Sequence, residues 1–154
     1  MPAIHSTPGT YMILLKLSSR SNIKIGRTRR VSLERGLYCY VGSALGPGGF
    51  TARLRRYASI GMRKHWHVDY LLPHAELIGA LVIEDSSRYE CSWASWVGRL
   101  ADSCIDGFGA SDCRCSGHLF YLGESLDKDQ FVNKAQEDLR ARHVSKQEML
   151  DLVG

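Results

Sequence analysis

The strongest structural signal in the chain is the stretch YCYVGSALGPGGFTARLRRY, residues 38–57. It begins with aromatic and β-branched residues that favour a strand, and the strand pattern ends at Gly42. A glycine-rich turn follows at 46–49, and a short helix is expected after Gly49. A strand end, a turn and a helix N-terminus bring hydroxyls, backbone N–H groups and guanidinium groups together, and such groups hold phosphates.

The predicted helix has two sides of different character. Apolar residues recur at helical spacing on the side expected to be buried: Phe50, Leu54, Tyr57 and Ala58. The remaining side carries three arginines: Arg53, Arg55 and Arg56. Because Arg53 and Tyr57 stand one turn apart, they can act on the same point.

The rest of the chain alternates between strand and helix patterns. Strands are expected at 9–17, 23–26, 31–33, 37–41, 77–83 and 118–122, and helices at 65–72, 86–104, 127–142 and after 145. The predicted fold class is α+β, with a small, mainly antiparallel central sheet of three to four strands flanked by helices. Residues 1–154 are expected to form a single domain, with 127–153 as a C-terminal helical extension.

Charge is unevenly distributed along the 154 residues. Residues 1–74 carry 12 Lys and Arg against two acids, whereas residues 75–154 carry eight against 14. A basic first half suggests a polyanionic partner, and unevenly shared surface charge is the simpler alternative. No apolar run is long enough for a membrane span, and the N-terminus lacks a signal-peptide pattern, so a cytoplasmic protein without a membrane partner is expected.

Five cysteines without an export signal are expected to be reduced thiols. Cys113, Cys115 and His118 offer three soft ligands within six residues, but structural zinc sites use paired C-x₂₋₄-C knuckles. The spacing does not match that pattern, so buried thiols are the expected state and zinc is not expected.

Three motifs in order resemble those of the GIY-YIG nuclease superfamily. They are the triplet Gly9-Thr10-Tyr11, the triplet Tyr40-Val41-Gly42, and a helix with Phe50-x-x-Arg53 followed by Tyr57. Glu90 stands where that superfamily has a helix glutamate. Three segments are similar to one branch of this superfamily: YVGSALG, HWHVDYLLPHA and GFGASDCRCSGHLFY. Its members are stand-alone domains, and in some proteins the domain is fused to an endonuclease III-type DNA glycosylase.

The resemblance implies hydrolysis of a DNA phosphodiester by water with one divalent metal, in DNA repair or processing, with DNA and a repair glycosylase or other repair factor as partners. Tyr11, with Tyr40, would orient or deprotonate the water, and Arg53 would neutralise charge on the phosphoryl oxygens. Tyr57 would contact a phosphate or the water. Glu90 would hold Mg²⁺ or Mn²⁺.

Further residues are candidates for the same site or for DNA binding. His65 is a candidate catalytic residue, and four basic residues are candidate DNA contacts: Arg55, Arg56, Arg63 and Lys64. The chain departs from the superfamily at Ser43, where a lysine is common after the second triplet.

Two alternatives remain open from the sequence. Ser87-x-x-Glu90 is a capping-box pattern, so Glu90 could be a helix cap instead of a metal ligand. The whole chain could also be a non-catalytic nucleic-acid-binding module on the same fold, because a basic surface with stacking aromatics suffices for binding.

Overall fold

Strand β1 (Gly9–Leu17) lies between two long antiparallel neighbours, β4 (Gly36–Ser43) and β5 (Glu76–Glu84), and every β1 residue except Lys16 is buried. A strand covered on both faces has a nearly continuous apolar sequence, and β1 has such a sequence. The computed structural model of the chain describes residues 7–25, 29–46, 48–58, 67–105 and 118–151.

The central sheet has six strands in the order β6-β7-β4-β1-β5-β8, and all neighbours are antiparallel. The three outer strands are short: β6 (Ser103–Ile105), β7 (Leu119–Gly123) and β8 (Arg142–Ser145). The α+β class with helices beside a mainly antiparallel sheet is confirmed. The predicted three to four strands are wrong, because β6 and β8 are too short to show a period-two pattern.

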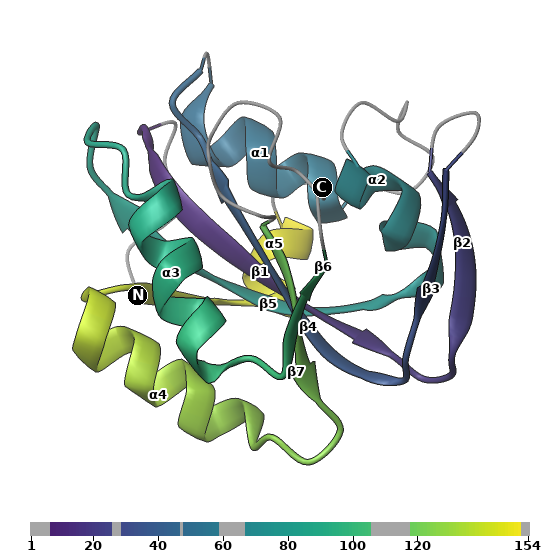
Figure 1. Ribbon diagram of the computed structural model, residues 1–154. Coiled ribbons are helices and arrows are strands. Elements are labelled where there is room, and N and C mark those ends of the chain that lie inside the picture. Colours follow the sequence, from purple (N-terminus) through teal and green to yellow (C-terminus); the bar gives the residue numbers. More distant parts are fainter. Residues whose placement is uncertain (1–6, 26–28, 47, 59–66, 106–117, 152–154) are drawn as a thin grey trace.

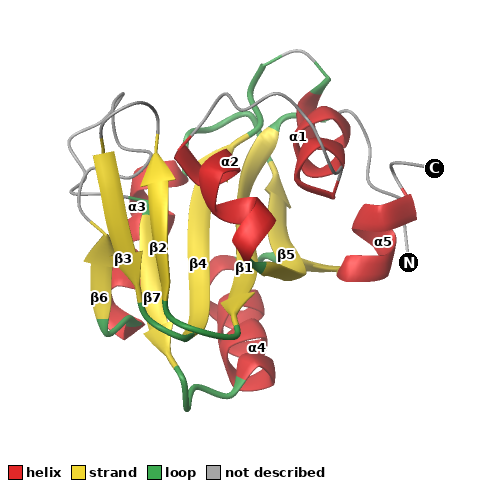
Figure 2. Cartoon of the chain, turned by 90° about the vertical axis from the view of Figure 1, so that its right-hand side faces the viewer, coloured by secondary structure: helices red, strands yellow, loops and turns green. Residues whose placement is uncertain are grey.

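Strands β2 (Ser21–Ile25) and β3 (Arg29–Leu33) form a separate two-stranded sheet within the connection from β1 to β4. Their antiparallel pairing joins the two strands expected near 23–26 and 31–33. Figure 2 shows this β2–β3 hairpin in front of the central sheet.

The helices cover the two faces of the central sheet (Figure 1). One face is packed by α1 (Gly49–Ala58), α2 (His67–Leu71), α5 (Lys146–Asp151) and the β2–β3 hairpin. A short 3₁₀ turn, η1 (Leu72–His74), follows α2. The other face is packed by α3 (Glu90–Leu100) and α4 (Lys128–Leu139). None of the helices in the described ranges is long and apolar enough to cross a membrane.

Side-chain alternation along β4 divides the interior into two cores. Tyr38 and Tyr40 lie in the core beneath α1, whereas Cys39 and Val41 lie in the core beneath α3 and α4. This alternation is what the strand predicted at 37–41 requires.

The segment 127–153, which was predicted as a helical extension, also contributes a strand to the central sheet. Asp127 caps α4 by accepting a hydrogen bond from the N–H of Asp129, and β8 then pairs with β5 at the sheet edge. The predicted helix at 127–142 is thus shorter, and part of the extension belongs to the central sheet.

Candidate functional site

Tyr11 and Tyr40 come from neighbouring strands and lie in the same core. The β1–β4 register places Tyr11 opposite Gly42 and Ile13 opposite Tyr40, and both phenols belong to the core beneath α1. Tyr11 is 1% exposed and Tyr40 6%. The expected adjacency of these two strands is therefore present.

Gly42 is the residue that lets the Tyr11 ring lie across β4. A Cβ atom at Gly42 would stand 2.5 Å from the Tyr11 hydroxyl oxygen and 2.6 Å from its Cζ, far closer than atoms pack. The second triplet thus supplies both a phenol, Tyr40, and the space in which the first triplet's phenol sits. Any larger residue at 42 would displace the Tyr11 hydroxyl.

Tyr57 joins the two strand tyrosines from α1. Its hydroxyl is hydrogen-bonded to the hydroxyl of Tyr11, and the two rings lie 5.5 Å apart with a tilt of 53°. The side chain is buried because Phe50 and Leu54 fix the same face of α1 against the sheet. The helix therefore delivers a third phenol to the group formed by Tyr11 and Tyr40.

Arg53 and Glu90 act on these phenols with opposite charge. The positive charge of Arg53 lowers the pKa of Tyr11, Tyr40 and Tyr57, although burial has the larger effect. The negative charge of Glu90 raises the pKa of Tyr11 and Tyr40. Because such effects weaken with distance, Arg53 on α1 and Glu90 on α3 both lie near enough to the phenols to influence their ionisation.

Burial dominates the ionisation of the three tyrosines. It raises the pKa of Tyr11 to about 12, and it raises the pKa of Tyr40 and of Tyr57 well above the ordinary value of a phenol. All three hydroxyls are therefore neutral at physiological pH. They can donate and accept hydrogen bonds, but none is a strong base by itself.

These shifts predict a loss of stability at alkaline pH. The unfolded tyrosine ionises near pH 10 while folded Tyr11 remains protonated to about pH 12, so its contribution is complete below pH 10 and is lost as pH rises from 10 to 12. Each such group lowers the free energy of unfolding by about 1.4 kcal/mol per pH unit. Burial shifts the pKa of Tyr38 and Cys39 upward too, with the same sign.

Denaturant unfolding across this pH range measures the slope, and Tyr40→Phe should make it less steep. A free energy of unfolding that stays flat above pH 10 would contradict the burial of these phenols.

Glu90 is the first residue of α3, and its carboxylate is held by two side chains. His118 Nδ1 lies 3.0 Å from Oε2, and the side chain of Ser43 also hydrogen-bonds to the carboxylate. Partial burial raises the pKa of Glu90, but these hydrogen bonds and the charge of His118 outweigh it, so the pKa lies below its ordinary value. The group is an ionised carboxylate with 26% of its side chain exposed.

The capping-box alternative for Glu90 is wrong. The helix begins at Glu90 with Tyr89 as its N-cap residue, so Glu90 is not at the third helical position that a capping box requires. The N–H of Ser87 instead donates to Asp85 Oδ1 at 2.8 Å. The predicted start of this helix at residue 86 is wrong for the same reason, and its end lies at Leu100 because β6 follows.

Thr10, the middle residue of the first triplet, fixes the start of α3. Its side chain is fully buried, and Oγ1 accepts a hydrogen bond from the N–H of Tyr89 at 3.3 Å. The first triplet therefore contacts both faces of the sheet. Tyr11 joins the phenols on one face, and Thr10 holds the helix end that carries Glu90 on the other.

Arg56 takes part in an internal ion pair. Its Nη2 donates to Asp69 Oδ2 at 2.7 Å, and the two side chains are 12% and 6% exposed. This side chain therefore ties α1 to α2. The sequence predicted only a DNA contact for Arg56 and not this internal role. Arg55 is exposed, as expected for a contact residue. Arg63, Lys64 and His65 lie outside the described residues.

Sequence reasoning missed the partners of Glu90. Ser43 attracted notice only as a departure from a lysine, and His118 was grouped with Cys113 and Cys115 as a zinc candidate. His118 is buried against Glu90 instead, and both cysteines lie outside the described residues. No local pattern links positions 43, 90 and 118, because they lie far apart in the sequence. Thr10 links the first two, since it pairs with Ser43 across β1 and β4 and accepts from the N–H of Tyr89. The N–H of Val41 donates to the carbonyl of His118.

The described residues fit one kind of metal better than others. Among them, no group of three or more His, Cys, Asp or Glu side chains could enclose an ion. A single ionised carboxylate such as Glu90 suits Mg²⁺ or Mn²⁺, which keep most of their waters and share the remaining positions with substrate phosphate. It does not suit zinc, which takes three or four protein ligands.

Comparison with known proteins gives one match. The model of a protein family described as a domain of unknown function, DUF123, matches residues 10–141. Neither the curated proteins nor the solved structures contain a match to this chain. The matched range contains the three phenols, Arg53 and Glu90.

Proposed function

The chain belongs to the DUF123 family of domains of unknown function, and from its own residues we propose that it is a metal-dependent DNA endonuclease of the GIY-YIG type. The observation that carries the proposal is a cluster of three buried phenols, Tyr11, Tyr40 and Tyr57. The Arg53 guanidinium and the ionised Glu90 carboxylate lie near enough to influence their ionisation. These groups match what hydrolysis of a phosphodiester requires, which is water activation, charge neutralisation and a cation ligand.

In the proposed reaction Arg53 binds the scissile phosphate. A guanidinium matches phosphate oxygens in two directions, and it counters the negative charge that grows on them as water attacks. Its position on α1, one turn before Tyr57, places the phosphate beside the phenols.

The phenols position the attacking water. Because Tyr11 and Tyr57 share a hydrogen bond and remain neutral, one hydroxyl can donate to its neighbour while accepting a hydrogen bond from the attacking water, which orients the water. Glu90 would hold Mg²⁺ or Mn²⁺ against the phosphate, and the ion, when bound, would lower the pKa of water and polarise the phosphoryl oxygen. His118 and Ser43 keep the Glu90 carboxylate ionised and oriented.

The proposed setting is DNA repair or processing in the cytoplasm, with a repair glycosylase or other repair factor delivering the domain to DNA. The exposed Arg55 on α1 would contact the DNA backbone beside the cleavage site.

Nicking of supercoiled DNA with and without Mg²⁺ tests the proposal. The wild-type protein is expected to nick only with metal, Arg53→Ala to lose about a hundredfold to a thousandfold in rate, and Tyr11→Phe to lose at least about a hundredfold. Arg99→Ala, which removes an exposed arginine from α3, is the matched control. DNA binding without cleavage at any metal concentration would instead favour the binding-module alternative.

A further inference from the structure

The β2–β3 hairpin has an outer face that is basic and exposed. Its register sets Lys24 directly opposite Arg30 and Asn22 opposite Ser32, and all four side chains are exposed. Within the described part of the chain, neither Lys24 nor Arg30 forms an ion pair with an acid. The segment 18–35 as a whole contains six Lys and Arg and one acid.

A directly opposed pair of like charges destabilises a two-stranded sheet. Side chains in such positions have Cβ atoms about 5 Å apart, and their repulsion opposes the pairing. Nothing in the packing of the hairpin requires a charge at either position, because both side chains point away from the core. A polyanion that binds across the pair would remove the repulsion.

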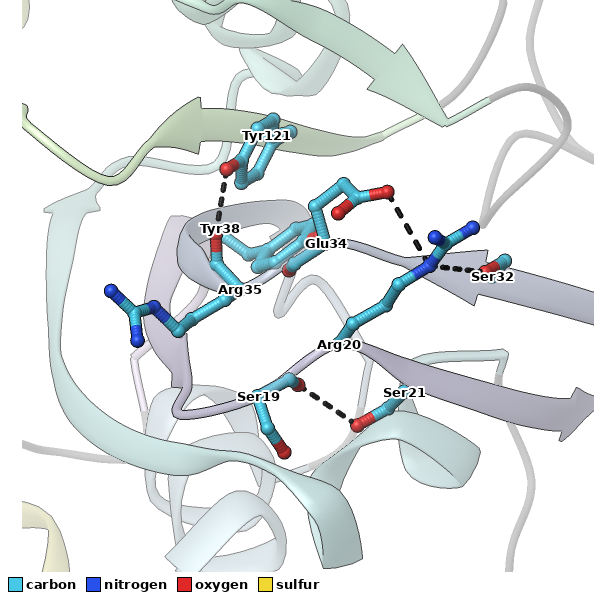
Figure 3. A network of polar contacts seen from close by, with 8 residues as sticks. All are labelled: Ser19, Arg20, Ser21, Ser32, Glu34, Arg35, Tyr38 and Tyr121. Atoms are coloured by element: carbon cyan, nitrogen blue, oxygen red, sulfur yellow. Dashed lines mark hydrogen bonds and ion pairs between the residues drawn. The ribbon is translucent and has the colours of Figure 1, made fainter.

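The hairpin is packed against the rest of the domain through its inner face. Its inner face buries Ile23, Ile25 and Leu33 in the core beneath α1 and α2. Figure 3 shows the base of the hairpin, where Arg20 contacts Ser32 and Glu34.

Two tyrosines of the central sheet fasten the turn from β3 to β4. The Tyr38 hydroxyl donates to the Glu34 carbonyl at 2.7 Å, and the Tyr121 hydroxyl donates to the Arg35 carbonyl at 2.6 Å. Their rings also contact each other, with centroids 5.0 Å apart. Since the hairpin base is tied to both β4 and β7, little ordering is needed for its outer face to bind.

The far end of the hairpin points toward the same side of the molecule as the candidate site. Strand β1 ends at Leu17 and β2 runs back from there, so β2 and β4 both proceed toward the edge where Gly42 and Tyr11 lie. In Figures 1 and 2 the ends of β2 and β4 lie on the upper side of both views, with α2 between the hairpin and α1.

We propose that the outer face of the β2–β3 hairpin is a second DNA-binding surface, which grips the phosphates of duplex DNA beside the segment held at the candidate site. Lys24 and Arg30 are the residues that contact the backbone. A basic two-stranded ribbon suits B-form DNA, whose major groove admits such a ribbon, whereas the major groove of duplex RNA is too deep and narrow. The partner rests on the proposed function, but the surface is separate from the cleavage site.

Binding to a short DNA duplex without metal, measured over a series of salt concentrations, tests this surface. Lys24→Gln combined with Arg30→Gln is expected to weaken binding by about tenfold or more and to reduce the slope of log affinity against log salt by about two. The variant's Tm should equal or exceed that of the wild-type protein, because the repulsion is gone. Lys128→Gln with Lys134→Gln, which removes two exposed charges from α4 on the opposite face, should change neither quantity.

Several outcomes would overturn the surface without touching the nuclease proposal. Equal salt slopes for the hairpin variant and the α4 control would do so if the wild-type protein still nicks DNA. If the hairpin variant lost affinity only for duplex RNA of the same length, the surface would belong to another partner. Conversely, a reduced slope in a protein that never nicks would keep the hairpin surface and remove the nuclease.

Discussion

Exchanging Glu90 for glutamine is expected to abolish metal-dependent strand cleavage, with a loss of about a thousandfold or more. The amide has the same shape, and its oxygen can still accept hydrogen bonds from His118 and Ser43. It carries no negative charge, however, so it binds a hard divalent cation poorly. Initial nicking rates over a series of Mg²⁺ concentrations measure the effect.

The matched control is Glu76→Gln. It removes the same charge from the first residue of β5, where Glu76 pairs in register with Lys16. It should nick like the wild-type protein. If Glu90→Gln also cleaves at the wild-type rate, Glu90 is no metal ligand, and its bonds to His118 and Ser43 serve the fold alone.

Gly9→Ala, which adds one methyl group, is expected to destabilise the protein more than most single substitutions do. A Cβ atom there would stand 2.0 Å from the backbone oxygen of Ile83 and 2.3 Å from Cζ of Phe50. The carbonyl belongs to the β1–β5 ladder and Phe50 is fully buried, so neither can move away freely. The expected loss is about 3 kcal/mol or more, a large share of the roughly 5–15 kcal/mol that stabilises a domain.

Gly46→Ala is the control for this experiment. Apart from its chain neighbours, no atom of the described residues lies within 4 Å of a Cβ built at Gly46, so the variant's free energy of unfolding should change by less than about 0.5 kcal/mol. Denaturant unfolding compares the two variants. Equal stabilities of the two variants would mean that β5 and Phe50 do not lie as close to Gly9 as described.

Sequence predicted the parts of the fold that local periodicity encodes. The apolar run of β1 and the alternation from Tyr38 to Val41 each reflect burial on known faces, and both are present. Strands β6 and β8 were missed, since three or four residues such as RHVS carry no period of their own. They are strands only because a longer neighbour offers its edge.

Two identical capping patterns show where sequence reasoning reaches its limit. At Ser145 and Glu148 the pattern forms a capping box, with reciprocal hydrogen bonds of 3.1 and 3.2 Å. At Ser87 and Glu90 it does not, because Asp85 accepts the Ser87 N–H and the helix begins three residues later. The choice depends on an upstream competitor, which the four-residue pattern does not include.

The same limit applies to the candidate site. The resemblance of the motifs predicted that Tyr11, Tyr40, Arg53 and Tyr57 share a site. The β1–β4 pairing and the bond between Tyr11 and Tyr57 bring the three tyrosines into one core. The attachment of Glu90 to His118 and Ser43 depends on contacts of β1 and β4 with the start of α3 and with the residue before β7, which lie far apart in the sequence.

The strand order also has a consequence for the chain during its synthesis. Strands β1 and β4 can pair once residue 43 has left the ribosome, but the other edge of β4 gains its partner only when β7, at 119–123, emerges. Until then the growing chain presents an unpaired edge, a ready template for misassociation with another nascent chain. Truncations that end before residue 119 should therefore aggregate on release, whereas those that retain β7 should remain dispersed.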